Sequence, residues 1–353
     1  MAIKKLILHI GFPKTGSTSI QSWLRANEAL LSDHGVLYPD TGKFFHHNFA
    51  RSFLRASLDH SSESSVVLKP NNTGNFEYNS LSTDRLNNLC DEWRLSNDFH
   101  TILISSEVFT WHWRHIDFEL LKKQLSGFEV SVLAYARPQH NFIEATYRER
   151  VQSFESRNSQ SFSAFLNEYR HESADYTLIL SRWLRVVDPE SISVKWYERD
   201  HFERRDVRCD FHAFAQLPLN FDDFQLPSID RNPSLHVLTL ELMRVANAFR
   251  LTKQRSVFSW VRQKLEAYDE HVKNKYGKQS YMSAELRLEI IETFKETNSH
   301  LAKGFSKKDS GLHLIGSGRD NTKNLMKNFP AREQKLLRRK AFMELLRFLL
   351  GIK

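Results

Sequence analysis

The chain of 353 residues carries 50 Lys and Arg against 42 Asp and Glu, a formal net charge of +8 at pH 7, and two cysteines. Two cysteines are too few for a disulfide scaffold. Cys90 and Cys209 also lack the spacing of a zinc site, so we assign no metal. The basic residues are dispersed and no nucleic-acid-binding signature accompanies them, so we expect acidic partners other than nucleic acid.

The first predicted element is a buried parallel strand over residues 5–10, a short and mostly aliphatic run. A glycine-bounded turn rich in hydroxyls follows it, and apolar residues at helical spacing follow the turn: Ile20, Trp23, Leu24 and Leu31. A strand, such a turn and a helix together present free backbone N–H groups and a positive dipole end to a phosphate. The sequence therefore predicts an anion-binding loop, although turn and N-cap requirements alone would also favour these residues.

The position of the lysine in this loop indicates which anion it binds. The phosphate loop of nucleoside triphosphatases places Lys directly after its second glycine. Here the residue after the second glycine, Gly16, is Ser17, and the lysine, Lys14, lies two residues before Gly16. This displacement favours a shorter phosphate chain, with Lys14 beside the group that is transferred or leaves.

The segment His9 to Gln21 resembles the 5′-phosphosulfate-binding loop of sulfotransferases that use 3′-phosphoadenylyl sulfate (PAPS), especially the bacterial carbohydrate-sulfotransferase-like group. The resemblance covers roughly residues 5–305, with strong motifs near 9–21 and moderate ones at 102–109 and 133–147. It implies an α/β fold with a P-loop NTPase-like parallel sheet flanked by helices. It also implies that the donor's 5′-phosphosulfate is held by Lys14, Thr15, Gly16, Ser17, Thr18 and Ser19.

Two histidines, His46 and His47, lie in a segment that we expect to enter a helix running through Arg55. A histidine in a segment of this kind more often packs in the core or faces solvent than takes part in catalysis. The resemblance, however, implies that a histidine near this point borders the acceptor cleft. Residues 60–83 are rich in Ser, Asn and Gly, which indicates a long surface loop. Both a lid and disorder are consistent with this composition.

A second buried strand is predicted at residues 100–105, and Glu107 follows it. In parallel sheets, ligands bind beyond the carboxyl ends of the strands, so this carboxylate is expected near Lys14 and is able to accept a proton from a hydroxyl. A helix-start charge is the structural alternative. The resemblance implies that Glu107 is the general base, and we keep His112 as the reserve candidate.

A third strand, residues 130–135, leads to Arg137. Pro138 favours a helix start, which leaves the Arg137 guanidinium at the strand end for an oxyanion. The resemblance implies that this Arg and a Ser eight residues later bind the 3′-phosphate. That later position is Ala145, and Thr146 beside it is the substitute candidate.

Farther along, we predict a helical stretch over 165–187, a strand over 191–197 and a helix over 207–217. Asn232, Ser234 and residues 297–302 match weaker landmarks of the resemblance. We expect a sulfotransferase domain over 1–305 and a basic helical extension over 306–353. In that extension, residues 331–353 suit self-packing, an oligomer contact or peripheral contact with a membrane. The N-terminal apolar run is too short for a secretory segment or a span, so we expect a cytoplasmic protein.

The resulting hypothesis is a PAPS-dependent sulfotransferase. Its acceptor would be a hydroxyl of a carbohydrate, either a glycan or a lipid-linked saccharide, and its nucleotide product 3′-phosphoadenosine 5′-phosphate. Two alternatives stay open: a nucleoside-triphosphate-dependent kinase on the same scaffold, and a catalytically inactive nucleotide-binding protein, which the Ala145 departure favours.

Overall fold

Five parallel strands form the centre of one of the two units into which the chain divides. The computed structural model describes residues 3–41, 46–55, 80–169, 171–227, 235–277, 279–305 and Met343. The first unit takes its described residues from 1–137, 175–229 and 297–314, and the second from 138–174, 230–296 and Met343. The predicted extension over 306–353 lies outside the described residues apart from Met343, so the predicted domain boundary stays a prediction.

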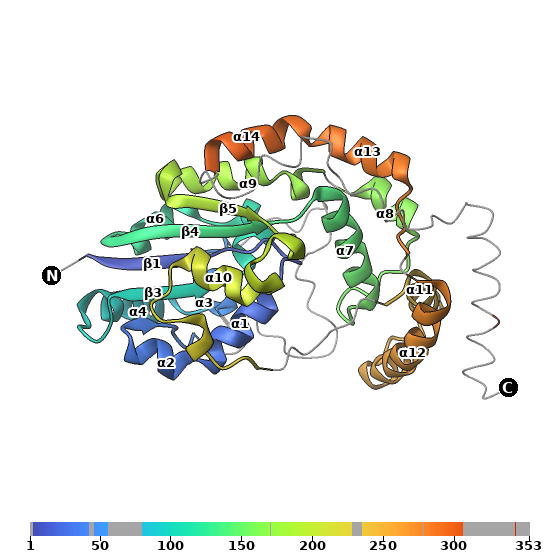
Figure 1. Cartoon of the computed structure of the whole chain (residues 1–353), viewed down its shortest axis with the longest axis horizontal. Helices are drawn as coiled ribbons and strands as arrows, with labels where there is room; N and C mark the ends of the chain where they lie inside the picture. Colours follow the sequence, from blue (N-terminus) through green and yellow to red (C-terminus); the bar gives the residue numbers. More distant parts are fainter. Residues whose placement is uncertain are drawn as a thin grey trace. The chain divides into compact units, whose positions relative to one another are not determined.

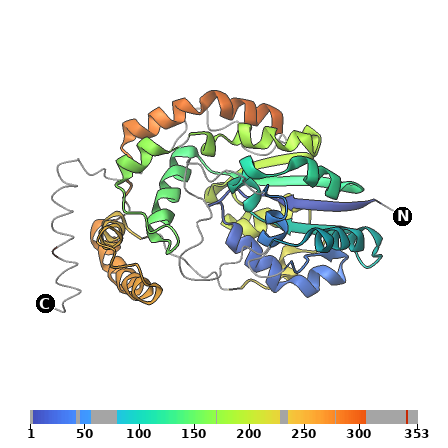
Figure 2. The same ribbon diagram turned by 180° about the vertical axis from the view of Figure 1, so that it is seen from behind.

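The sheet has the order β2-β3-β1-β4-β5, and each adjacent pair is parallel. Its strands are β1 (Lys4–His9), β2 (Val36–Leu37), β3 (Thr101–Ser105), β4 (Phe128–Ala136) and β5 (Ile192–Trp196). Figure 2 shows β1 in blue between β3 and β4 in teal. Because β1 is the central strand, the loop at its carboxyl end is flanked by the ends of β3 and β4.

Helices cover both faces of this sheet (Figure 1). Those of the first unit are α1 (Ser17–Ala26), α2 (Glu28–Asp33), α3 (His47–Arg51), α4 (Thr83–Leu95), α5 (Val108–Trp111), α6 (Phe118–Leu125), α9 (Tyr176–Ser181), α10 (Val207–Ala215) and most of α14 (Lys295–Phe305). Its short 3₁₀ turns are η1 (Trp113–His115), η3 (Trp183–Arg185), η4 (Pro189–Ser191), η5 (Arg199–His201), η6 (Glu203–Arg205) and η7 (Phe221–Asp223).

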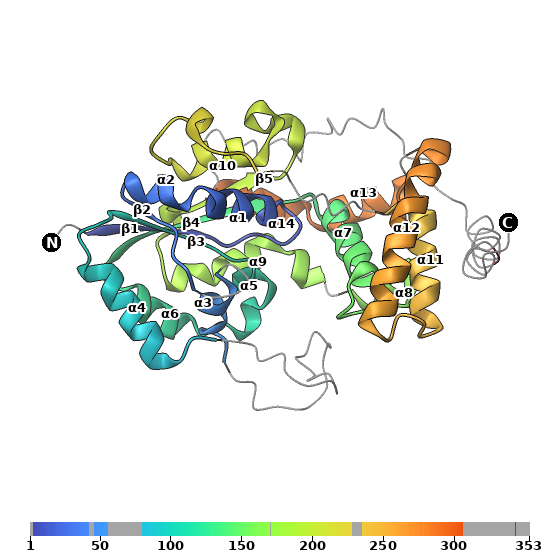
Figure 3. The same ribbon diagram turned by 90° about the horizontal axis from the view of Figure 1, so that it is seen from below.

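Alternation along the strands explains the two covered faces. Ile7 of β1 and Leu103 of β3 pack in one cluster with residues of α1, α2 and α10. Leu6 and Leu8 of β1, which point to the other face, are also fully buried. Figure 3 shows α1, α2 and α10 on one side of the sheet and α4 and α6 on the other.

The second unit is helical. It contains α7 (Gln139–Gln152), α8 (Phe162–Glu168), the 3₁₀ turn η2 (His171–Ala174), α11 (Val237–Ala248), α12 (Arg255–Tyr276) and α13 (Ala284–Thr293). Its own apolar core includes Phe142, Tyr147, Leu240, Met243 and Phe258. Among the described helices, including the 22 residues of α12, none is both long and apolar enough to cross a bilayer.

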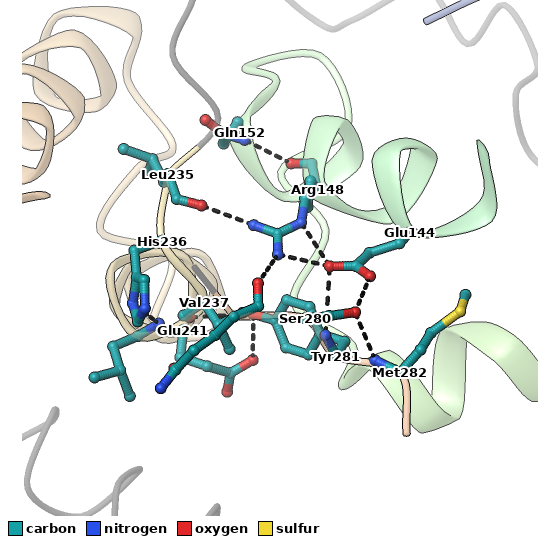
Figure 4. Close-up of polar contacts among 12 residues, drawn as sticks. Glu144, Arg148, Gln152, Leu235, His236, Val237, Glu241, Ser280, Tyr281 and Met282 are labelled. Atoms are coloured by element: carbon teal, nitrogen blue, oxygen red, sulfur yellow. Dashed lines mark hydrogen bonds and ion pairs between the residues drawn. The ribbon is translucent and has the colours of Figure 1, made fainter. Parts of the chain in front are cut away.

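A buried ion pair fastens α7 within this unit (Figure 4). Arg148 donates from Nε and Nη2 to Glu144 Oε1 at 2.9 and 2.6 Å, and its other bonds reach the carbonyls of Leu235 and Gln279. Glu144 also accepts from the Ser280 hydroxyl and the Tyr281 amide. Since these contacts all lie within the unit, we interpret this cluster as structural.

The predicted α/β class, with a parallel sheet flanked by helices, is confirmed. The strands predicted at 5–10, 100–105, 130–135 and 191–197 correspond to β1, β3, β4 and β5, and the helix predicted at 207–217 to α10.

Three helix predictions were wrong in extent. The first helix is interrupted at Asn27, whose side chain donates to the carbonyls of Trp23 and Gln225, so α1 and α2 are separate. The helix expected to reach Arg55 ends at Arg51, and Ser52 is its C-cap. Beyond it, Leu54 pairs with Ile116 in an isolated antiparallel bridge, which a helix continuing to Arg55 would not allow.

The stretch 165–187 is also divided into shorter pieces. The Asp175 carboxylate accepts from the Leu178 amide and caps a new helix, α9, so the chain restarts there instead of continuing from α8. Residues 60–79 of the predicted surface loop, together with Asn232 and Ser234, lie outside the described residues.

Candidate active site

The loop between β1 and α1 is fastened to β4 on its strand side. The Phe12 amide donates to the Tyr135 carbonyl at 2.9 Å, and the Tyr135 amide donates to the Gly11 carbonyl at 2.7 Å. The Thr15 hydroxyl donates to the Phe12 carbonyl and closes the turn. These bonds extend the sheet pairing into the first half of the loop, so its second half projects from the sheet edge as a fixed turn.

Both glycines of the loop are required by their surroundings. Gly11 has φ +99°, and a Cβ placed there would lie 3.1 Å from Glu107 Cβ. Gly16 has φ +79°, and its Cβ would lie 3.0 Å from a ring carbon of Tyr197. Positive φ together with such close approach leaves no room for a side chain at either position. The first of these contacts also places Glu107 directly against the loop.

Hydrogen-bond donors gather at the start of α1. Gly16 is its N-cap, and the Ile20 amide makes a helical bond to the Gly16 carbonyl, so the amides of Ser17, Thr18 and Ser19 have no partner within the helix. The buried Ser17 hydroxyl has no hydrogen-bond partner among the described residues. Lys14 is half-buried, and its backbone is left-handed, with φ 65°. Amides, a hydroxyl and a lysine in this order suit an oxyanion ligand.

Arg137 lies at the carboxyl end of β4 and reaches the same loop. Its Nη1 donates to the Lys14 carbonyl at 3.2 Å, and its own carbonyl accepts from the Tyr176 hydroxyl at 2.6 Å. Arg137 as a whole is half-buried. The structure therefore brings Arg137 and the loop together, as the positions of their strands predict.

Glu107 lies just beyond β3, at the N-cap position of α5, but its carboxylate makes no capping bond within the described chain. Instead Oε2 accepts from Gln21 Nε2 at 3.0 Å, and Oε1 lies 3.9 Å from His47 Nε2. The side chain of Glu107 is 18% exposed. A partly exposed carboxylate is chemically able to accept a proton from a hydroxyl.

The two adjacent histidines divide between structure and site. His46 is buried, accepts from the Ser105 amide at 2.8 Å and contacts the Pro39 carbonyl, and burial lowers its pKa to about 3. His47 instead pairs with the Ser106 hydroxyl through Nδ1 at 2.9 Å. Burial lowers the pKa of His47, and Glu107 opposes that effect. His47 is therefore the histidine beside the candidate base.

The two remaining candidates have other surroundings. His112 ends α5, where its ring stacks on Trp111, and burial lowers its pKa to about 4. Thr146 belongs to α7 in the second unit, and its hydroxyl donates to the Phe142 carbonyl of the same helix at 2.9 Å. The assignment of Thr146 to the 3′-phosphate stays a prediction.

Sequence reasoning gave no role to Gln21 and left His47 undecided. Gln21 lies four residues after Ser17, so it shares one face of α1 with the loop donors, and this spacing was the available signal. Contact with Glu107 depends on how α1 packs against β3, which no local pattern reveals.

Within the described ranges, His, Cys, Asp and Glu side chains form no group of three or more that is able to hold a metal ion.

No protein-family model matches the chain. A curated but uncharacterized protein from Archaeoglobus fulgidus is 26% identical over 210 residues, which are 58% of this chain and 53% of the relative. The chain thus spans about half the length of the curated relative it matches. Among solved structures, a sulfotransferase from Alicyclobacillus acidocaldarius has a TM-score of 0.40 at 15% identity, covering 73% of this chain and 97% of that one.

Proposed function

We propose that this protein is a sulfotransferase that moves a sulfuryl group from PAPS to a carbohydrate hydroxyl. The observation that carries the proposal is the 3.0 Å hydrogen bond from Gln21 Nε2 to Glu107 Oε2, which joins a carboxylate to the helix that follows the anion-binding loop. Arg137, at the end of the neighbouring strand, adds a cation at the Lys14 carbonyl. A base, a loop of donors and two cations at one sheet edge are the parts that transfer of an anionic group requires.

The donor would be held by the loop and by Arg137. The amides of Ser17, Thr18 and Ser19 and the Ser17 hydroxyl would bind the 5′-phosphate, with Thr15 and Gly16 shaping the turn. Arg137 would bind the 3′-phosphate, because a guanidinium matches phosphate oxygens with paired donors. Thr146 is the proposed second contact. PAPS itself supplies the activated sulfuryl group.

The reaction we propose is an in-line displacement. The acceptor hydroxyl oxygen forms a bond to sulfur while the bond from sulfur to the bridging phosphate oxygen breaks. The acceptor proton passes to Glu107, and the electron pair of the broken bond leaves with 3′-phosphoadenosine 5′-phosphate. Lys14 would stabilise the negative charge that develops on the bridging oxygen. The carbohydrate class of the acceptor rests on the resemblance of residues 9–21.

Ligand binding separates this proposal from a kinase. Calorimetry in a buffer with EDTA should show that 3′,5′-ADP binds at one site. In a separate titration with excess Mg²⁺ and no EDTA, ATP should bind far more weakly. Magnesium-dependent ATP binding without binding of 3′,5′-ADP would overturn the proposal in favour of the kinase. Binding of 3′,5′-ADP without transfer to any acceptor or to water would indicate an inactive nucleotide-binding protein.

A further inference from the structure

Gln21 is the side chain that joins the helix of the anion-binding loop to the candidate base. It is 1% exposed, and its Nε2 lies 3.0 Å from Glu107 Oε2, 3.3 Å from the Ser105 carbonyl and 3.2 Å from the Ser105 hydroxyl. A buried amide with three such neighbours has little rotational freedom.

The chemistry of these neighbours fixes which way the amide faces. A backbone carbonyl only accepts hydrogen bonds, and so does an ionised carboxylate. The NH₂ group of Gln21 must therefore point toward Ser105 and Glu107, since the amide oxygen would repel both. In this orientation, Gln21 donates to Glu107 Oε2.

A buried histidine, His9, contacts the Ser105 hydroxyl and extends this set of hydrogen bonds. His9 Nδ1 lies 2.7 Å from the Ser105 hydroxyl, and burial lowers the pKa of His9 to about 3, so the ring is neutral. The tautomer of the neutral ring decides whether Nδ1 accepts from the Ser105 hydroxyl or donates to it, and in both cases the Ser105 oxygen has a lone pair that accepts from Gln21. His9, Ser105, Gln21 and Glu107 thus form one continuous chain of hydrogen bonds.

We propose that Gln21 is a positioning residue that holds the Glu107 carboxylate at a fixed place relative to the donor loop. Because Gln21 follows Ser17 by one helical turn, the same rigid helix presents the donor amides and aims the base. Among the described residues, His47 on α3 and Tyr38 after β2 are two other titratable groups that interact with this carboxylate. This inference rests on the proposed function for its catalytic meaning, but the hydrogen bond itself is testable without activity.

The direct test is an NMR titration of ¹³C-glutamate-labelled protein, with the Glu107 signal assigned from Glu107→Gln. In Gln21→Glu, two carboxylates meet at a contact of 3.0 Å. The titration midpoint at Glu107 should then rise by about one pH unit or more. Gln21→Leu, which removes the donor, should raise the midpoint as well. Gln124→Glu is the matched control: a buried glutamine of the same unit that bonds to Asn87 and should leave the midpoint unchanged.

A kinetic measurement then tests the positioning role. Gln21→Leu should lower kcat for sulfuryl transfer by about 10- to 100-fold while the affinity for 3′,5′-ADP changes little. An unchanged midpoint in both Gln21 variants would overturn the inference, whatever the activity. If the midpoints move but the wild type neither binds 3′,5′-ADP nor transfers sulfate, the hydrogen bond stands and the proposed function fails. Shifted midpoints with unchanged kcat in an active enzyme would refute the catalytic role of Gln21.

Discussion

Arg137 donates from Nη1 to the carbonyl oxygen of Lys14 at 3.2 Å and so joins the end of β4 to the loop that follows β1. Lys14 has a left-handed backbone, and its carbonyl oxygen accepts this bond from outside the loop. The cation assigned to the 3′-phosphate therefore also supports the loop assigned to the 5′-phosphosulfate. Tests of Arg137 must separate these two roles.

Arg137→Gln removes the charge but keeps a polar side chain with an N–H donor. We expect the affinity for 3′,5′-ADP to fall by about 10- to 100-fold, the value of a charge-assisted hydrogen bond, and the affinity for 5′-AMP to change much less. Calorimetry with both nucleotides measures the difference. Equal losses for the two ligands would mean that Arg137 supports the loop and does not bind the 3′-phosphate.

Glu107→Gln and His112→Gln decide between the two candidate bases. The glutamine at 107 preserves shape but is a far weaker base, so transfer should fall by about 10²- to 10⁴-fold. His112→Gln should retain most activity, because His112 ends α5 and stacks on Trp111. Initial rates of transfer at saturating PAPS compare the two, with circular dichroism as the control for folding. Loss of activity only in the His112 variant would reverse the assignment.

Acid should destabilise the first unit through its buried histidines. Burial lowers the pKa of His9 and of His46 from 6.5 to about 3. Below pH 6.5 the unfolded chain therefore binds protons that the folded state does not, and stability falls as the pH drops from 6.5 toward 3. The slope is at most about 1.4 kcal/mol per pH unit for each histidine.

Urea unfolding at several pH values across this window measures that slope. We expect His46→Gln to be less stable than the wild type at neutral pH but also less sensitive to acid. His34→Gln, at an exposed histidine, should keep the wild-type slope. An identical slope in the wild type and His46→Gln would contradict this explanation.

The Glu144–Arg148 pair should carry stability and no chemistry. Both side chains are nearly buried, 12 and 13% exposed, so Glu144→Gln leaves a buried guanidinium without its counter-charge. We expect a loss of about 3 kcal/mol in the free energy of unfolding. The matched control is Glu266→Gln, in a half-exposed pair with Arg262 on α12, which should cost less than about 1 kcal/mol. Comparable losses in the two variants would contradict the structural role.

Local sequence patterns were sufficient for four of the five strands, but not for the short β2 (Val36–Leu37), and they supplied candidate residues at the strand ends. Buried parallel strands are short and aliphatic, and their carboxyl ends share one edge of the sheet. The sequence pattern of β1, β3 and β4 therefore points to Lys14, Glu107 and Arg137, which follow the ends of these strands. The break at Asn27 was not identifiable in this way, because it depends on contacts with Gln225, 198 residues away.

The contacts within the site were equally hidden from the sequence. Gln21 and His47 reach Glu107 from two helices that the sequence does not orient relative to β3. The difference between His46 and His47 likewise comes from which ring the Ser105 amide meets. Periodicity predicts which residues are buried, whereas the partner of a buried polar group is fixed by packing between elements.

Transfer of labelled sulfate from PAPS is the most direct test of the central claim, that the loop holding Lys14 is a sulfuryl-transfer centre. Wild type and Lys14→Ala should be compared across a panel of saccharides, with water as the default acceptor and 3′,5′-ADP binding as the control for an intact site. We expect the wild type to transfer label and Lys14→Ala to be slower by about 10²- to 10³-fold, the cost of removing one donor to a developing charge. Equal rates in the two proteins would contradict the account.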